Sequence, residues 1–383
     1  MTKSPTPAAL GYRLPAEWEP HAATWIAWPH ERNDWPGKFG PIGWVYTEIA
    51  RLLAPHETVV IVVPSRRVRR RVSEMLANSG VEPASGRIRF MLARTDRSWL
   101  RDTMPTFVVR SLNGLPLADP KPLAAVEWRF NGWAKYENHR RDVRLPRKVC
   151  KRLGLRRFKP RVVTGSKLRR AVLEGGAIDS NGRGTLLTTE ECLLSPDLSV
   201  RNPGLSRAGY ETLFAQHLAV RHTIWLGRGI EGDDTHGHVD DIARFVNENT
   251  VVAAVEPNVH DPNHAVLSDN LKRLHAARDQ DGNPLQIVEL PMPAPVVFDG
   301  QRLPASYANF YIANGIVLVP VFNDPNDMRA LNTLAQVFPK HQVVGVYSRD
   351  LVLGLGTLHC LTREQPKTID APSVPLENPT ESA

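Results

Sequence analysis

The residue best suited to covalent chemistry in this chain is Cys360, near the C-terminal end. It follows a glycine-rich stretch, 354–359, and an apolar run at 343–347 that predicts a buried strand. A cysteine just past a strand and a glycine-rich bend can stand in a cleft with backbone close around it. We therefore predict that Cys360 is a nucleophile. The alternative is a purely structural thiol, because free cysteine is among the most buried residue types.

Four further side chains could serve this thiol: Asp102, Glu174, His238 and Asp240. Carboxylates match the planar, cationic guanidinium, whose N–H donors form a fork. Two of them could hold a guanidinium with its central carbon against a thiolate, which would attack that carbon. A histidine would protonate the leaving ammonia and then take a proton from water, and the third carboxylate would orient or charge the imidazole. These residue types suit hydrolysis of a guanidine to a ureido group.

The polar stretch 231–241 allows two other interpretations. In an extended segment His236, His238 and Asp240 share a face, and three such ligands could bind a divalent metal. The surrounding acidic residues are also compatible with a solvated turn that has no role in a site. Spacing alone leaves catalysis, metal binding and a solvated turn open.

An α/β framework must position these residues. Apolar runs predict strands, and helical spacing of apolar residues predicts helices between them. Asn181-Gly182 and Asn314-Gly315 predict hairpin turns, and Ser268 is the predicted N-cap of the fourth helix. We expect strands at 24–28, 58–63, 88–92, 106–109, 172–179, 184–189, 222–226, 250–255, 285–290, 307–312, 316–321 and 343–347, and helices at 44–53, 66–77, 206–218, 269–278 and 327–337.

Hairpins and β-helix-β passages are mixed along the whole chain, and no linker long enough to separate domains is visible. We therefore predict a single α/β domain over residues 10–366, with disordered tails at 1–9 and 367–383. No strict sequence repeat is visible.

The composition, with 42% hydrophobic and 23% charged residues among 383, is typical of a globular protein. No apolar run approaches the roughly 20 residues that span a bilayer. Residues 1–9 contain no secretory apolar region, so we expect a cytoplasmic protein with no membrane partner. Three cysteines without CxxC spacing indicate neither a disulfide framework nor a cysteine zinc site.

The net charge of +8 comes from one segment. Residues 140–170 contain 14 Lys and Arg and one acid, Asp142, so the rest of the chain is net negative. Such a segment fits a surface for nucleic acid or another anionic partner, or a solvated face with snorkelling Lys and Arg. We favour the second, because the segment has no interleaved aromatics apart from Phe158 and no recognisable nucleic-acid motif. A nucleic-acid-binding protein is the alternative from another class.

Several motifs, taken together and in order, resemble the agmatine deiminase family, also called the bacterial-type peptidylarginine deiminase family. The resemblance covers roughly residues 10–366. Its motifs are PAEWEPHAATWIAWP at 15–29, SWLRDTMPTFVV at 98–109, LEGGAID at 173–179, GTLLTTEECLL at 184–194, GHVDD at 237–241, ASYANFYIANG at 305–315 and GLGTLHCLTREQP at 354–366.

The resemblance implies a pentein fold, in which five ββαβ-type blades surround a central site. It implies that Cys360 is the nucleophile and that His238 is the general acid and base, with Glu174 as its partner. Asp102 and Asp240 would grip the guanidinium. The resemblance also implies that no metal and no cofactor take part.

The implied reaction converts agmatine to N-carbamoylputrescine and ammonia, through a covalent cysteine thiouronium intermediate, in putrescine and polyamine biosynthesis. Trp99, next to the predicted guanidinium grip, would pack on the substrate. Arginine, peptidyl arginine or another alkylguanidine stays open as the substrate, and so does an amidinotransferase reaction with an amine in place of water. Association into a homo-oligomer is compatible with the sequence.

The sequence departs from the family pattern at three motifs. Family members often have DTGP at the positions of 102–105, DTDGHVDN at those of 234–241 and GGGNIHC at those of 354–360. The catalytic positions are kept, whereas Met104, His236 and Thr357 are among the altered residues. We expect these changes to alter the wall around the far end of the substrate more than the deimination chemistry.

Overall fold

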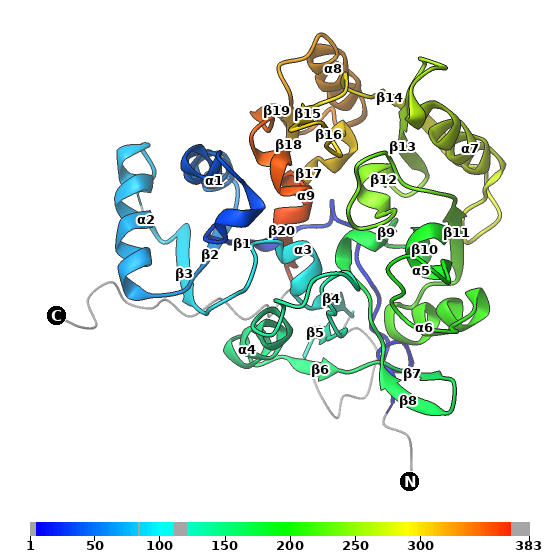
Figure 1. Ribbon diagram of the computed structural model, residues 1–383. Coiled ribbons are helices and arrows are strands. Elements are labelled where there is room, and N and C mark those ends of the chain that lie inside the picture. The colour runs from blue at the N-terminus through cyan, green and yellow to red at the C-terminus, as the bar shows by residue number, and fades with distance from the viewer. Residues whose placement is uncertain (1–4, 83–84, 111–120, 369–383) are drawn as a thin grey trace.

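The structure is a computed structural model and describes residues 5–82, 85–110 and 121–368. Five sheets of three or four strands in this portion of the chain lie around a common centre, with helices on the outside (Figure 1). Within the same residues, no helix combines the length and apolar composition needed to cross a bilayer. The predicted α/β class is confirmed.

Each sheet repeats one topology. A short first strand pairs antiparallel with a middle strand, and the chain then crosses through a helix to a strand parallel to the middle one. Four of these units are β4 (Thr106–Val109), β5 (Leu123–Val126), α4 (Leu145–Arg152), β6 (Arg156–Phe158); β9 (Asp179–Ser180), β10 (Thr185–Thr189), α6 (Arg207–Leu218), β11 (His222–Leu226); β12 (Ala243–Phe245), β13 (Thr250–Val255), α7 (Pro262–Ala276), β14 (Gln286–Pro291); and β17 (Tyr311–Ala313), β18 (Ile316–Val321), α8 (Asp327–Val337), β19 (Gln342–Tyr347).

The fifth unit joins the two ends of the chain. Its first strand is the last of the sequence, β20 (Thr362–Pro366), which pairs antiparallel with β1 (His21–Ala27). The parallel strands β2 (Thr58–Val63) and β3 (Ile88–Leu92) follow, through α1 (Phe39–Leu53) and α2 (Arg66–Asn78). Outside the five units lie α5 (Glu190–Leu194) and two ribbons, β7 (Arg161–Thr164) with β8 (Lys167–Arg170) and β15 (Val297–Phe298) with β16 (Gln301–Arg302).

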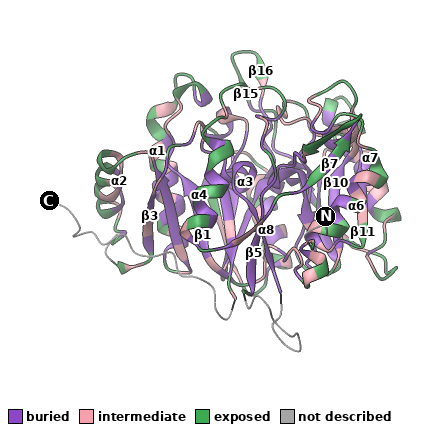
Figure 2. Cartoon of the chain, turned by 90° about the horizontal axis from the view of Figure 1, so that it is seen from below, coloured by how far each residue is buried: buried purple, intermediate pink, exposed green. Residues whose placement is uncertain are grey.

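The middle strands are apolar because both of their faces are covered. In β2, Thr-Val-Val-Ile-Val-Val, five of the six residues are buried, as expected of a strand between two parallel neighbours or under helices. The helices are amphipathic: α1 buries Ile42, Tyr46, Ile49 and Leu53 along one face. Figure 2 shows the result, with buried strands inside and exposed helix faces outside.

Several element boundaries differ from the sequence-based expectation. Helix α7 begins at Pro262 rather than after Ser268, because Asp261 is the N-cap and accepts a hydrogen bond from the Asn263 N–H at 2.9 Å. Helix α1 begins five residues early, at Phe39. The expected strands at 172–179 and 307–312 are replaced by short 3-10 turns followed by β9 and β17.

The predicted hairpin turns are confirmed: Gly182 and Gly315 take the positive φ angles of 71° and 70° between antiparallel partners. The expected N-terminal tail is shorter than 1–9, because Ala8–Leu10 forms a 3-10 helix. Most of the expected C-terminal tail, 369–383, and residues 1–4 lie outside the described residues.

Candidate active site

Five short helical turns meet at the centre of the ring, and each directly precedes the first strand of one unit. Their neighbours in space are one another: α3 contacts η5 and α9, η5 contacts η6, η6 contacts η7, and η7 contacts α9. The turns are α3 (Leu100–Thr103), η5 (Gly175–Ala177), η6 (Val239–Asp241), η7 (Tyr307–Asn309) and α9 (Leu358–Leu361). The predicted site residues lie on four of these turns or directly before them. Different units therefore contribute site residues from the same place in their topology, just before the first strand.

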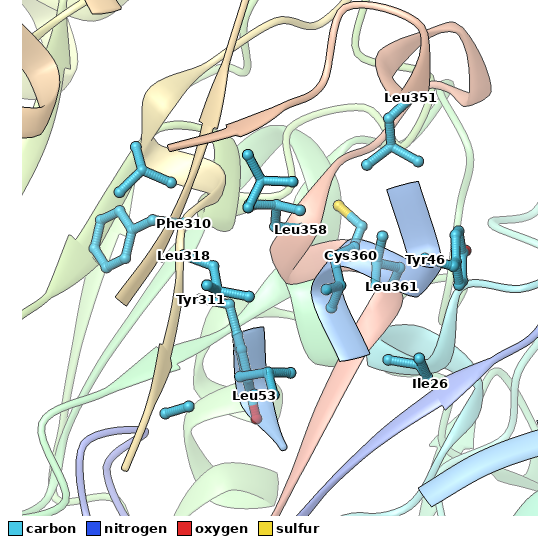
Figure 3. Packing of buried hydrophobic residues seen from close by; sticks show 14 of the residues in the cluster. Ile26, Tyr46, Leu53, Phe310, Tyr311, Leu318, Leu351, Leu358, Cys360 and Leu361 are labelled. Carbon is cyan, nitrogen blue, oxygen red and sulfur yellow. The ribbon is translucent and has the colours of Figure 1, made fainter. Parts of the chain in front are cut away.

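Cys360 is on α9, and its side chain lies among the buried hydrophobic residues of the core (Figure 3). It also lines the cavity described below. Its Sγ accepts a hydrogen bond from Asn309 Nδ2 at 3.2 Å and lies 3.8 Å from Asp240 Oδ2. Burial raises the pKa of the thiol well above its usual range, and the neighbouring carboxylates of Asp240, Asp241 and Asp102 raise it further. The resting thiol is therefore neutral near pH 7.

The two carboxylates predicted to hold a guanidinium flank this thiol and differ in their partners. Asp102 is held at both oxygens, by the Gly176 N–H at 2.9 Å and by Trp133 Nε1 at 2.9 Å. Asp240 Oδ2 lies 2.6 Å from His359 Nδ1, whereas its Oδ1 is buried without a hydrogen-bond partner among the described residues. Asp240 therefore has an oxygen available for a donor that enters the site.

His238 directly precedes η6 and is 1% exposed. Its Nδ1 lies 4.0 Å from Asp102 Oδ2, and its Nε2 has no partner within the described ranges of the chain. Although burial alone would lower the pKa of this imidazole, Asp102 and other neighbours raise it well above its usual range. A protonated His238 beside Asp102 is suited to give a proton to a leaving amine.

Glu174, the predicted partner of His238, lies directly before η5 and is fully buried. Its Oε1 accepts a hydrogen bond from Arg201 Nε at 3.1 Å, and its Oε2 has no partner among residues that the structure describes. The nearest side-chain atoms of Glu174, Cys192 and His238 lie within 4.8 Å of one another. Glu174 is thus close to the imidazole, but its hydrogen bond goes to Arg201.

Gly176, in η5, allows the site residues to approach one another. A Cβ atom at this position would lie 2.5 Å from His238 Nδ1, 2.9 Å from Asp240 Oδ2 and 3.2 Å from Asp102 Oδ1. These distances are shorter than ordinary van der Waals contacts. Only a glycine fits between the imidazole and the two carboxylates without moving them.

A cavity of about 390 Å³ leads to Cys360. Its lining includes Asp102 and the aromatic side chains of Trp99, Trp133 and Tyr136. Trp99 also packs against Trp35, with ring centroids 5.6 Å apart. Trp99 thus lines the same cavity as Asp102, where aromatic faces are available to a planar cation.

Three further carboxylates line the cavity: Asp34, Asp234 and Asp299. Asp34 pairs with Arg97, and burial raises the pKa of the Asp34 carboxyl to about 6. Asp234 pairs with Lys135 and accepts a hydrogen bond from Tyr136 Oη at 2.5 Å.

Four residues around the site were not predicted from the sequence: Asn309, His359, Trp133 and Glu17. Glu17 Oε2 lies 2.7 Å from His359 Nε2, so His359 links Glu17 to Asp240. Asn309, His359 and Glu17 lie inside motifs quoted above, but nothing in those motifs indicated that the three side chains meet at one site. Trp133 stands outside every motif and reaches Asp102 from a turn in which it has a φ of 56°.

Two expectations need correction. Met104, His236 and Thr357 are not among the residues that line the cavity, whereas Leu355, which stands where the family pattern has glycine, is one of them. Thr357 instead donates a hydrogen bond to Asn309 Oδ1 at 2.8 Å. His236 turns to Ser199 Oγ, 2.6 Å from its Nδ1, and the groups in the described residues that could hold a metal do not combine it with His238 and Asp240.

Five repeated ββαβ units around a buried thiol, a histidine and paired carboxylates define the class of the protein as a pentein. The family model of the Porphyromonas-type peptidyl-arginine deiminases matches residues 13–366. The chain belongs to this family, which confirms the resemblance seen in the motifs.

Curated relatives cover nearly the whole chain. The chain is 34% identical to the agmatine deiminase of Ectopseudomonas mendocina, over 95% of this chain and 98% of that protein. It is 35% identical to the agmatine deiminase of Stutzerimonas stutzeri, with the same coverage. Among solved structures, the agmatine deiminase of Enterococcus faecalis superposes with a TM-score of 0.83 at 29% identity, over 95% of this chain and 98% of that one.

Proposed function

We propose that this protein is an agmatine deiminase, which hydrolyses agmatine to N-carbamoylputrescine and ammonia. The observation that carries the proposal is the thiol of Cys360, 3.8 Å from Oδ2 of Asp240, at the end of a cavity that Asp102 also lines. The other oxygen of Asp240, Oδ1, has no hydrogen-bond partner among the described residues. A guanidinium is the common group that presents several N–H donors and an electrophilic carbon in one plane. The agmatine deiminases of similar sequence support agmatine as the substrate.

The first half of the reaction forms a covalent intermediate. Asp102 and Asp240 accept hydrogen bonds from the guanidinium, whose positive charge offsets the carboxylates that raise the thiol pKa. Cys360 then loses its proton, with Asp240 Oδ2 at 3.8 Å as the nearest acceptor, and the thiolate attacks the guanidinium carbon. The imidazolium of His238 protonates one amino group, the carbon–nitrogen bond breaks, and ammonia leaves a thiouronium on Cys360.

The second half restores the enzyme. Water gives a proton to the imidazole of His238 and attacks the thiouronium carbon. The carbon–sulfur bond then breaks and the added hydroxyl loses its proton to solvent, so that the ureido product forms. The sulfur takes back the proton that Asp240 had accepted, which restores the thiol. An amine in place of water would give amidino transfer instead of hydrolysis.

The test is ammonia release from agmatine, arginine, a blocked arginine peptide and simple alkylguanidines. Cys360→Ala is expected to abolish turnover, whereas Cys150→Ala is the matched control, because Cys150 is a buried cysteine on α4, outside the site. A covalent adduct on Cys360, seen by mass spectrometry after a rapid acid quench, would support the thiouronium step. Turnover that survives Cys360→Ala would refute the proposal.

Activity on a guanidine other than agmatine would keep the mechanism and change the substrate. If agmatine is the substrate, the enzyme acts in the formation of putrescine, and we expect it in the cytoplasm.

The basic segment 140–170 forms α4, β6, β7 and β8 at the outer edge of the ring (Figure 1). The nucleic-acid alternative predicts a steep loss of DNA retention with salt and no effect of Cys360→Ala.

A further inference from the structure

Asn309 joins three of the central turns. It lies on η7, and its Oδ1 accepts hydrogen bonds from the N–H groups of His359 at 3.1 Å and Cys360 at 3.4 Å, and from Thr357 Oγ1. Its Nδ2 donates to Cys360 Sγ at 3.2 Å and to Asp241 Oδ1 at 2.9 Å. All the partners of Oδ1 lie on or just before α9, so these bonds tie Asn309 to the nucleophile's own turn.

Asp241 supplies the link to the opposite side of the site. It is the last residue of η6, the turn that carries Asp240 and follows His238. Its side chain is buried, and its backbone carbonyl accepts a hydrogen bond from Ser306 Oγ at 2.8 Å. We infer that Asp241 is a positioning residue, which anchors Asn309 to η6 and thereby keeps Nδ2 aimed at Cys360 Sγ.

The chemistry of a carboxyl group suits this role. A carboxylate oxygen accepts hydrogen bonds and does not donate them, so the atom of Asn309 that faces Asp241 is the amide nitrogen. An amide turned by 180° would point its oxygen at the thiolate that must form at Cys360, which would repel it. Because Asp241 holds the amide nitrogen of Asn309 toward the site, Nδ2 can donate a hydrogen bond to Cys360 Sγ.

The groups that face Asp241 are Asp240 and Asp233, which are acidic, His238, and the amide of Asn309. Burial and then these two acids raise the pKa of the Asp241 carboxyl well above its usual range. A protonated carboxyl keeps a carbonyl oxygen that accepts from Nδ2, so the anchor does not depend on the charge of Asp241.

The experiment measures the rate at which iodoacetamide alkylates Cys360, across pH, with the modified residue identified by peptide mass spectrometry. Asp241→Ala is expected to react about tenfold or more slowly than Asp241→Asn. Both variants lack the carboxylate that raises the thiol pKa, but only in the alanine variant does Asn309 Nδ2 lose its anchor and with it the hydrogen bond to the thiolate, and hydrogen bonds to charged groups are the strong ones. Asp241→Asn, whose amide oxygen can accept from Nδ2, should restore most of the rate. Asp279→Ala, the same change in a loop outside the site, should leave the rate unchanged.

A double-mutant cycle tests the route through Asn309. If Asp241 acts through this amide, Asp241→Ala added to Asn309→Ala slows alkylation no further than Asn309→Ala alone. The same cycle with Asp241→Leu, which keeps the size of the side chain but cannot accept a hydrogen bond, serves if the alanine variant does not fold. Independent effects that multiply, or alkylation of Asp241→Ala as fast as that of Asp241→Asn at every pH, would overturn the inference.

The positioning role of Asp241 concerns the thiol on which the proposed function also rests, but alkylation needs no guanidine. Failure of the wild-type protein to release ammonia from any guanidine would refute the proposed function. The alkylation experiment would still test the positioning role of Asp241.

Discussion

Replacing Gly176 with alanine should disable the site while leaving the backbone conformation allowed. The added Cβ would lie 2.5 Å from His238 Nδ1, against about 3.4 Å for an ordinary contact. The imidazole is 1% exposed and cannot swing into solvent. It must therefore move by about 1 Å, and a misplacement of that size in a catalytic group costs about 100-fold in rate.

The assay is kcat for ammonia release, together with thermal unfolding of the same preparations. Overpacking of a well-packed centre also lowers the free energy of unfolding, by about 1–3 kcal/mol. Gly40→Ala is the matched control: it makes the same chemical change in helix α1, where the added methyl meets no atom within 4 Å. It should leave kcat unchanged and stabilise the helix by up to about 1 kcal/mol.

A kcat for Gly176→Ala within about threefold of the wild type would refute this reasoning, since a 1 Å shift predicts far more. A fall in kcat that Gly40→Ala shares equally would show a general effect of glycine replacement. A variant with full activity and a lower melting temperature would place the strain outside His238.

Trp133→Phe keeps an aromatic ring, although a smaller one, and removes the donor at 2.9 Å from Asp102 Oδ2. We expect kcat/KM for a guanidine to fall about 10- to 100-fold, more than the melting temperature alone would explain. Glu17→Ala leaves the buried guanidinium groups of Arg101 and Arg244 without this carboxylate, and we expect a loss of about 3–5 kcal/mol in the free energy of unfolding, measured by urea titration. His21 is buried; burial alone would lower its pKa, but the adjacent carboxylate raises it to about 9. Its stabilising contribution of about 3 kcal/mol is present below pH 6.5 and is lost as the pH rises through about 9, which melting curves of His21→Gln and the wild type should show.

Each of these three expectations has its own contrary result. Unchanged kcat/KM in Trp133→Phe would mean that Asp102 does not need this donor. Glu17→Ala as stable as the wild type would show that water or neighbouring groups compensate both guanidiniums. Parallel melting curves for His21→Gln and the wild type between pH 6 and 10 would show that His21 is not protonated in the fold.

Strands such as 58–63 and 316–321 could be predicted because burial on both faces leaves an uninterrupted apolar run. The short turns that carry the site could not. Segments 172–179 and 307–312 contain enough apolar residues to look like strands, yet η5 and η7 occupy a portion of each. Their helical geometry is set by contacts with the other central turns, which a local pattern does not contain.

The repeat of five units could not be seen in the sequence either, because a shared fold of the units does not require a shared sequence pattern. What the units share is a strand order and a turn that faces the centre, while no strict repeat is visible in their sequences. The candidate residues Asp102, His238, Asp240 and Cys360 could be selected by their chemistry and by motif. Trp133 reaches Asp102 from a loop in which only the folded chain brings the two together.

The pairing of β1 with β20 joins the two ends of the chain, and the position of the nucleophile depends on it. Trp25 Nε1 donates to Gln365 Oε1 at 3.0 Å, across 340 positions of sequence. Strand β20 directly follows the turn that carries Cys360, so the nucleophile is held in place only after the last strand has found the first. Loop closure over such a distance is among the late and slow events of folding. We therefore expect the other four units to form before the enzyme becomes active. The recovery of Cys360-dependent activity during refolding would then report the rate at which β20 pairs with β1.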